Sequence, residues 1–366
     1  MTSAFVERLD RVVPKRMQEL GLPGAALALI DGGRVSTLRC WGLADRETAA
    51  PLTEHTVFRL ASISKSFAAW AVMTLVERGD VNLDAPIERY VRRWRLPPSP
   101  HDAAGVTVRR LLTHTAGVSV EGLGQRLPER TSTLVEALNN ELPAAPPDCG
   151  PYQARWKLPD AAPTRLAWPP GQGFHYSNAG FALLELMVEE VSGQRFAAYV
   201  EQAVLRPLGL THAGFVLPPG PASATAYSEA GHAIARLRPL CAAAGGLCAS
   251  IRDLARFACA EMAGPDGEPA GRGVLSSGSM AAMFTSHGPA EHDESSGLDF
   301  EAGLGHMLCS IGGAKNVHHS GGFVGWRSIY SVFPELGAGL CMLINSDGGN
   351  ELWQPLIQDW GHSLGG

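Results

Sequence analysis

The sequence lacks the patterns that mark metal enzymes, nucleic-acid-binding proteins and membrane proteins. It contains no Cys-x-x-Cys and no His-Glu-x-x-His, so it indicates no zinc site, and we expect neither a metal nor a cofactor. The net charge is −6 and the basic residues form no stripe, so a nucleic-acid partner is not expected. Because no apolar run approaches the ~18 residues of a membrane-spanning helix, no membrane partner is expected either.

The N-terminal residues are not expected to be a signal peptide. Residues 1–18 are charged and amphipathic and lack the hydrophobic core of a signal peptide. The seven cysteines are odd in number, widely scattered and mostly set among apolar residues, which is typical of buried thiols in a reducing compartment. The sequence therefore predicts a cytoplasmic protein, and nothing in it specifies an oligomeric state.

Lysine is scarce, and one of the few lysines lies close to a serine at the start of a predicted helix. Only four occur among 366 residues, and Lys65 follows Ser62 by three positions where an apolar helix begins that ends at Gly79. Residues three apart share a helix face, so the hydroxyl and the amine should point at the same spot. A serine needs a neighbouring base, and a desolvated amine at a helix N-terminus is disfavoured as a cation. The pair predicts a nucleophile with its base, beside free N–H groups for an oxyanion.

A second cluster joins a glycine-rich turn, residues 170–173, to a helix that should begin near residue 179. Residues two apart in extended chain face the same side, so Tyr176 and Asn178 could enter one cleft. A phenol can relay a proton, and an amide can bind a substrate carbonyl. Asn178 could instead cap the helix.

A third cluster, residues 318–326, contains His319, Ser320, Gly321 and Gly322 after a predicted strand. Glycines let a backbone approach a ligand closely and aim N–H groups at it. Taken alone, the cluster could also be a plain glycine-rich turn. For the other histidines of these regions, His114, His175 and His318, we expect hydrogen-bonded structural roles.

The order of elements predicts an α/β fold in which a helical segment interrupts a sheet. Residues 1–80 and 235–366 should form the sheet domain, and 81–234 a mostly helical domain with proline-rich pocket loops. Trp156 and Trp168 favour the proline-rich loop over 142–171 as a pocket wall. The expected elements are a hairpin over 24–41, helices over 108–112, 133–139, 181–191, 196–205 and 351–363, strands over 316–319, 326–333 and 339–345, and proline-rich loops over 96–105 and 142–171.

Together the three clusters resemble the class C β-lactamase and penicillin-recognising serine hydrolase family, including its family VIII-type esterases, D-aminopeptidases and transacylases. Phrases between them add to the resemblance: Leu-Asp-Ala-Pro at 83–86, Leu-Leu-Thr-His-Thr-Ala-Gly at 111–117, Pro-Leu-Gly-Leu at 207–210 and Gly-Gly-Leu at 245–247. The resemblance implies a mainly antiparallel sheet flanked by helices, with an inserted all-helical lobe above the cleft.

For the site, the resemblance implies that Ser62 is the acylated nucleophile and that Lys65 and Tyr176 share the acid and base work. It also implies that Asn178 orients the substrate and that the N–H groups of Ser62 and Gly322 form an oxyanion hole. Where β-lactamases of the family have Lys-Thr-Gly or Lys-Ser-Gly, this chain has His-Ser-Gly at 319–321. A histidine with a pKa near ~6.5 is mostly neutral at pH 7.5 and binds a carboxylate less well than a cation does. Efficient β-lactamase activity is therefore not expected.

These observations predict a serine acyl-enzyme hydrolase that cleaves a small-molecule ester, amide or thioester. One alternative is an acyltransferase that passes the acyl group to an amine or alcohol, and another is a covalent sensor or assembly protein without turnover. Residues 361–365 match the Gly-x-Ser-x-Gly elbow of other hydrolases, but that elbow needs a strand before its serine. Here a helix should precede Ser363, so we do not expect it to be the nucleophile.

Overall fold

A nine-stranded sheet forms the centre of the computed structural model, which describes residues 2–120, 125–126, 133–141, 163–293 and 298–364. The strand order is β3-β2-β1-β13-β12-β11-β10-β9-β8, and every neighbouring pair is antiparallel. The first strand, β1, therefore lies between β2 and the last strand, β13, so the two ends of the chain build one sheet. The predicted fold class, a mainly antiparallel sheet flanked by helices, is confirmed.

The elements have the following bounds. The strands of the large sheet are β1 Gly24–Asp31, β2 Arg34–Asp45, β3 Ala50–Pro51, β8 Glu291–Asp293, β9 Leu298–Gly303, β10 His306–Ile311, β11 Ala314–Phe323, β12 Trp326–Phe333 and β13 Ala338–Ile344. Two short ribbons pair β4 (Val57–Arg59) with β7 (Cys248–Ser250) and β5 (Gln125–Arg126) with β6 (Arg238–Pro239). The α-helices are α1 Thr2–Glu19, α2 Ser64–Glu77, α3 Val108–Leu112, α4 Leu134–Leu138, α6 Asn178–Ser192, α7 Phe196–Val200, α8 Ala242–Gly245, α9 Ile251–Ala260, α10 Ser277–Met283 and α11 Asn350–Leu364.

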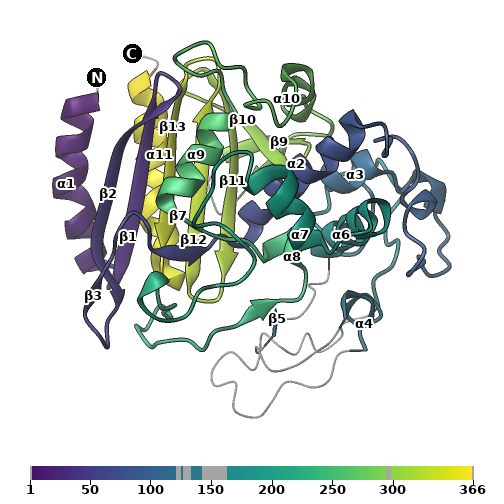
Figure 1. Ribbon diagram of the computed structural model, residues 1–366, viewed down its shortest axis with the longest axis horizontal. Coiled ribbons are helices and arrows are strands. Elements are labelled where there is room, and N and C mark those ends of the chain that lie inside the picture. The colour runs from purple at the N-terminus through teal and green to yellow at the C-terminus, as the bar shows by residue number, and fades with distance from the viewer. Residues whose placement is uncertain (1, 121–124, 127–132, 142–162, 294–297, 365–366) are drawn as a thin grey trace.

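Helices cover both faces of the sheet. On one face α1 and α11 pack against alternate strand residues such as Leu27 and Met342 (Figure 1). On the other face α9 packs against β1 and β13, whose Ala28 and Leu343 belong to the same buried cluster as α2. Successive strand side chains point to opposite faces, so strands covered on both sides become apolar at every position. The strands β1 and β13 are apolar in this way, and seven residues of β1 and all of β13 are buried.

The hairpin predicted over 24–41 is confirmed as β1 and β2. Its turn places Gly32 at φ +59° and Gly33 at φ +71°, a left-handed pair that glycine adopts without a side-chain penalty. The three predicted strands after residue 315 and the final helix are also confirmed. Helix α11 is one residue longer at each end, whereas β11 extends from 314 to 323 and so is much longer than the predicted 316–319. The cysteines expected as unpaired thiols are free at Cys40, Cys241, Cys248, Cys259, Cys309 and Cys341. Cys149 lies outside the described residues.

The described part of residues 81–234 contains the predicted helices as α3, α4, α6 and α7, together with the short strand β5. Helix α6 begins at Asn178, one residue before the start expected near 179 and three before the periodic stretch 181–191, and a π-helical turn (Glu201–Leu205) continues α7. One buried apolar cluster extends from these helices to the sheet, and the division into two domains stays a prediction.

The proline-rich loop over 142–171 is predicted to form a pocket wall that contains Trp156 and Trp168. Trp168 stacks on His175, with ring centroids 4.0 Å apart, directly before Tyr176 in the chain. Residues 142–162, with Trp156, lie outside the described residues, and so does much of the predicted loop.

None of the helices described combines the length and the apolar character needed to cross a bilayer.

Candidate active site

Ser62 and Lys65 lie in contact at the start of the central helix. Ser62 belongs to a 3₁₀ turn (Ala61–Ile63) that leads directly into α2, and Lys65 Nζ lies 3.1 Å from Ser62 Oγ. The serine is half-buried, whereas the lysine is fully buried. Residues three apart along a helical turn lie on the same face, which explains the close approach. The predicted nucleophile and base are therefore brought together.

The backbone before Ser62 has an uncommon conformation. Ala61 has φ +49°, in the left-handed region that a residue with a Cβ rarely adopts. The turn is held by Ser64 Oγ, which donates to the Ala61 carbonyl (2.6 Å) and accepts the Leu247 N–H (2.9 Å). The Leu60 N–H donates to the Leu247 carbonyl (2.9 Å). Bonds from residues far along the chain thus maintain the strained turn that presents the Ser62 hydroxyl.

A backbone carbonyl that the sequence did not reveal also binds the lysine. Lys65 Nζ donates to the Ala244 carbonyl oxygen (2.9 Å) of the short helix α8. Among the described residues, no carboxylate lies within ion-pair distance of this amine. The sequence contains a sign of this region in Gly245-Gly246-Leu247, but no pattern identifies a carbonyl as a partner.

Tyr176 and Asn178 lie where the chain enters α6. Lys65 Nζ lies 4.7 Å from the centroid of the Tyr176 ring, so the phenol ring joins the first pair. Asn178 is half-buried and is the first residue of α6. The helix cap is Ser177, whose Oγ accepts the Gly180 N–H (3.0 Å), so the alternative that Asn178 caps the helix is wrong.

Residues 318–323 of the third cluster form the second half of β11, so the alternative of a plain glycine-rich turn is wrong. This strand packs against the turn that contains Ser62. A Cβ at Gly321 would overlap the Leu60 carbonyl oxygen and the Ser328 hydroxyl, so only glycine allows this approach. Ser320 is half-buried, and Gly322 is exposed next to the contact. The strand thus brings the predicted Gly321 and Gly322 beside the Leu60–Ser62 backbone.

His319 is buried in β11, and its Nδ1 lies 2.7 Å from the Ser320 carbonyl. A carbonyl only accepts, so this nitrogen carries the proton. Burial lowers the pKa of His319 well below 6.5, and the Lys65 charge, when present, lowers it further. The imidazole is therefore neutral at pH 7, as the sequence analysis expected, and it offers no cation to a substrate carboxylate.

Ser363 lies inside α11, and its Oγ donates to the Trp360 carbonyl (2.6 Å). No strand precedes it within the described chain from Asn345 onward, so the elbow geometry is absent there. Among the residues that the structure describes, no three His, Cys, Asp or Glu side chains gather as metal ligands.

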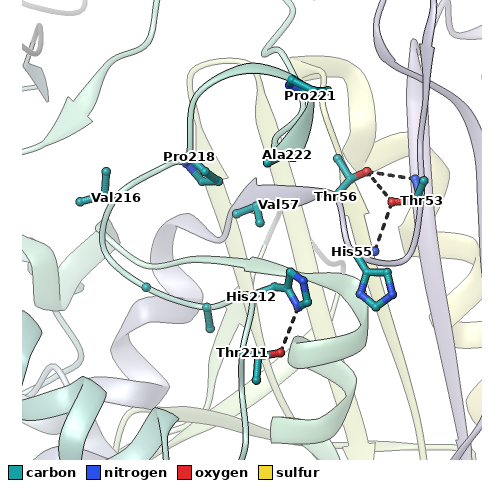
Figure 2. A pocket seen from close by; sticks show the side chains of 12 residues that line it. Thr53, His55, Thr56, Val57, Thr211, His212, Val216, Pro218, Pro221 and Ala222 are labelled. Carbon is teal, nitrogen blue, oxygen red and sulfur yellow. Dashed lines mark hydrogen bonds between the residues drawn. The ribbon is translucent and has the colours of Figure 1, made fainter.

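A separate cavity of about 430 Å³ contains none of the predicted site residues. Figure 2 shows that its wall combines two imidazoles, threonine hydroxyls and apolar side chains. The rings of His55 and His212 have centroids 4.8 Å apart, and the Thr211 hydroxyl lies 3.1 Å from His212 Nδ1. The lining offers no nucleophile with an adjacent amine, which distinguishes it from the site at Ser62.

Comparison with known proteins agrees with this fold. The family model described as Beta-lactamase matches residues 9–359, and the chain belongs to that family.

Among curated relatives, the esterase EstB of Burkholderia gladioli is 36% identical over 214 residues, which are 58% of this chain and 52% of the esterase. A β-lactamase of Pseudomonas fluorescens is 28% identical over 253 residues, 68% of this chain and 62% of that protein. The matches thus span about half to two thirds of the length of these two relatives.

Two solved structures show the same fold. A D-amino acid amidase of Ochrobactrum anthropi SV3 has a TM-score of 0.74 with 24% identity and covers 99% of both chains. An octameric penicillin-binding protein homologue of Pyrococcus abyssi has a TM-score of 0.73 with 26% identity, covering 94% of this chain and 74% of that one.

Proposed function

We propose that this protein is a serine acyl-enzyme hydrolase that cleaves a small ester, amide or thioester. The observation that carries the proposal is the contact of 3.1 Å between Lys65 Nζ and Ser62 Oγ at a buried helix start. A serine hydroxyl becomes nucleophilic when an adjacent base takes its proton, and this pair has the required geometry. The family match and the similarity to an esterase support hydrolysis of a small molecule.

In the proposed acylation, Ser62 Oγ attacks the substrate carbonyl carbon while its proton moves to the nitrogen lone pair of Lys65. The Ala244 carbonyl accepts one amine hydrogen, which leaves the nitrogen lone pair free to face the hydroxyl. The tetrahedral intermediate places its negative oxygen between the N–H groups of Ser62 and Gly322. The approach of β11 to the Leu60–Ser62 turn supports this pairing of donors.

The intermediate then expels the alcohol, amine or thiol, which receives the proton through Lys65 and Tyr176. The position of the lysine amine near the Tyr176 ring supports a shared proton circuit. Water next attacks the acyl-enzyme, gives its proton to the same groups and releases the acid with Ser62 regenerated. Asn178 and the segment His319-Ser320-Gly321 would hold the acyl portion. The neutral His319 favours uncharged esters and amides over substrates that present a carboxylate.

The test is acylation of the purified protein by a series of p-nitrophenyl esters, followed by stopped-flow release of nitrophenol and by mass spectrometry of the protein. We expect a burst equal to the enzyme concentration and an acyl adduct on the peptide that contains Ser62. Ser62→Ala should abolish both, and Ser363→Ala should keep both. A Ser62→Ala protein with wild-type turnover would overturn the proposal.

A second measurement separates hydrolysis from transfer. The acylated protein is offered amines and alcohols, and the products are compared with the free acid. Release of acid alone supports the hydrolase and removes the acyltransferase alternative. A stable adduct without steady-state release would instead indicate the non-turnover sensor.

A further inference from the structure

We propose that His114 is the positioning residue for Tyr176. Its imidazole binds the backbone N–H of Ser177, the residue directly after the tyrosine, and packs against the phenol ring. This inference rests on the proposed function, because it concerns the geometry of the acid and base groups. No sequence pattern assigned His114 more than a structural hydrogen bond.

The first observation is a pair of hydrogen bonds that enclose Tyr176. The His114 carbonyl accepts the N–H of His175 (2.7 Å), and His114 Nδ1 accepts the N–H of Ser177 (3.0 Å). One residue therefore holds the chain directly before and directly after the tyrosine. Because both partners are backbone groups, the bonds set the position of the Tyr176 Cα whatever its rotamer.

The second observation is ring packing on the phenol itself. The His114 and Tyr176 rings have centroids 4.3 Å apart with an interplanar angle of 31°. The same imidazole lies 5.5 Å from the ring of Phe174 and 5.2 Å from that of Phe181. His114 thus occupies the centre of an aromatic group that also contains the phenol, and Lys65 Nζ lies near the Tyr176 ring at 4.7 Å.

The third observation is the backbone conformation of His114. It follows the short helix α3 with φ +56°, a left-handed conformation that most side chains disfavour. This conformation directs the carbonyl and the imidazole of one residue toward the same segment. The surrounding contacts therefore maintain a conformation that costs free energy, as is common near functional sites.

The bond from Ser177 requires an unprotonated Nδ1, since that nitrogen accepts the N–H. Burial lowers the pKa of His114 well below 6.5, and the charges of Lys65 on α2 and His319 on β11, when present, act in the same direction. Protonation would place two N–H donors against each other. The neutral imidazole, with its hydrogen on Nε2, is thus the form that holds Tyr176.

The test uses two substitutions that both tolerate a positive φ. Asparagine at 114 keeps an acceptor at the position of Nδ1, whereas glycine removes the side chain and leaves the backbone free to adopt φ +56°. We expect His114→Gly to lower the acylation rate roughly tenfold to hundredfold, because small displacements of catalytic groups cost that much. KM should change less than threefold, and His114→Asn should recover most of the loss.

A double-mutant cycle separates positioning from general stability. In a Tyr176→Phe background no phenol proton remains to be positioned, so His114→Gly should reduce the rate less than threefold further. Equal losses in both backgrounds, or a His114→Asn variant as slow as His114→Gly, would overturn the inference. If glycine prevents folding, the asparagine variant alone is compared in the two backgrounds, and its smaller loss must vanish without the phenol.

Failure of the proposed function has a different signature. If Ser62→Ala leaves acylation intact, the hydrolase assignment fails whatever His114 does. The position of the imidazole proton is then measured without turnover by ¹⁵N NMR of the wild-type protein. A hydrogen on Nε2 from pH 5 to pH 8 supports the geometry, and the signal is assigned to residue 114 by its absence in His114→Asn. A hydrogen on Nδ1 contradicts the geometry.

Discussion

The Glu185 carboxylate accepts the backbone N–H of Ala243 at 2.9 Å, one residue before the carbonyl that receives the Lys65 amine. The Cys241 thiol lies 3.3 Å from the same carboxylate oxygen. Both partners of the carboxylate belong to the start of α8, and the carboxylate itself is buried on α6. A single acidic group thus fixes the short helix that in turn fixes the proposed base.

This carboxylate should make stability depend on pH. Burial raises the pKa of Glu185 from 4.5 to about 7, against the opposing effect of its hydrogen bonds. Between pH 4.5 and 7 the folded protein holds a proton on Glu185 that the unfolded chain has released. The contribution of Glu185 to the free energy of unfolding is therefore most favourable at low pH and is lost as the pH rises through 7. At ~1.4 kcal/mol per pKa unit, the loss is about 3 kcal/mol.

Glu185→Gln keeps an acceptor for the Ala243 N–H and cannot ionise. Urea denaturation at pH 5, 6, 7 and 8 should therefore show the wild type losing stability relative to the variant as the pH rises. His114 and His319 titrate in both proteins, so their opposite contribution cancels in the difference. A difference that stays constant across the four pH values would contradict the assigned ionisation.

Removing the proposed acid and base groups should slow acylation without abolishing binding. Lys65→Ala and Tyr176→Phe should each lower the burst rate by ~10²–10⁴, the usual contribution of a positioned proton carrier. Stopped-flow release of nitrophenol measures the rate, and thermal unfolding checks that each variant is folded. Near wild-type rates in a folded Lys65→Ala protein would exclude this amine as the base.

His319 should leave the discrimination between neutral and anionic substrates independent of pH. Because its pKa lies well below 6.5, the imidazole stays uncharged from pH 6 to pH 8. We expect the ratio of kcat/KM for a neutral ester to that for a matched ester with a carboxylate in its acyl chain to be constant over this range. A ratio that falls severalfold toward pH 6 would show that the histidine gains a charge there.

A cation at the same position should change that ratio. His319→Lys is expected to move it toward the carboxylate ester roughly tenfold, because a hydrogen bond to a charged group contributes ~1.5 kcal/mol. His319→Gln is the matched neutral control and should leave the preference unchanged. Identical ratios in the two variants would exclude contact between residue 319 and the acyl carboxylate.

Gly321→Ala should lower the acylation rate, because residue 321 lies against the backbone turn that precedes Ser62. The added Cβ would overlap the Leu60 carbonyl and the Ser328 hydroxyl, so β11 or the turn before Ser62 must move. Such overpacking costs ~1–3 kcal/mol, and displacement of the turn should lower acylation more than stability alone explains. Gly278→Ala in α10 is the control, since its Cβ meets no atom closer than 3.8 Å. Equal activity in the two variants would contradict the close approach.

The parts of the site that sequence could predict are those set by local spacing. The three-residue step from Ser62 to Lys65 follows from helical periodicity, and a strand at residues 316–319 follows from the apolar pattern. The turn expected at Gly321 and Gly322 is wrong, because β11 continues through both residues to Phe323. The partners of Lys65 could not be predicted in the same way, because Ala244 lies 179 residues away and contributes only a backbone carbonyl.

His114 and Glu185 illustrate the same limit for side chains. The sequence shows both residues, but their roles depend on bonds to Ser177 and Ala243 that only the folded chain brings near. One local alternative that failed, Asn178 as a helix cap, concerned a choice between neighbouring residues. Ser177 and Asn178 are both good caps, and the fold decides which side chain turns toward the helix N–H groups.

The burial of Lys65 has a practical consequence for attaching this protein to a surface. Amine-reactive supports couple to accessible lysines, and Lys15, 78% exposed on α1, lies on the side of the sheet opposite α2 (Figure 1). The proposed base, fully buried, is shielded from the same reagents. Coupling through α1 would leave the whole thickness of the sheet between the matrix and α2, at whose start Ser62 lies (Figure 1).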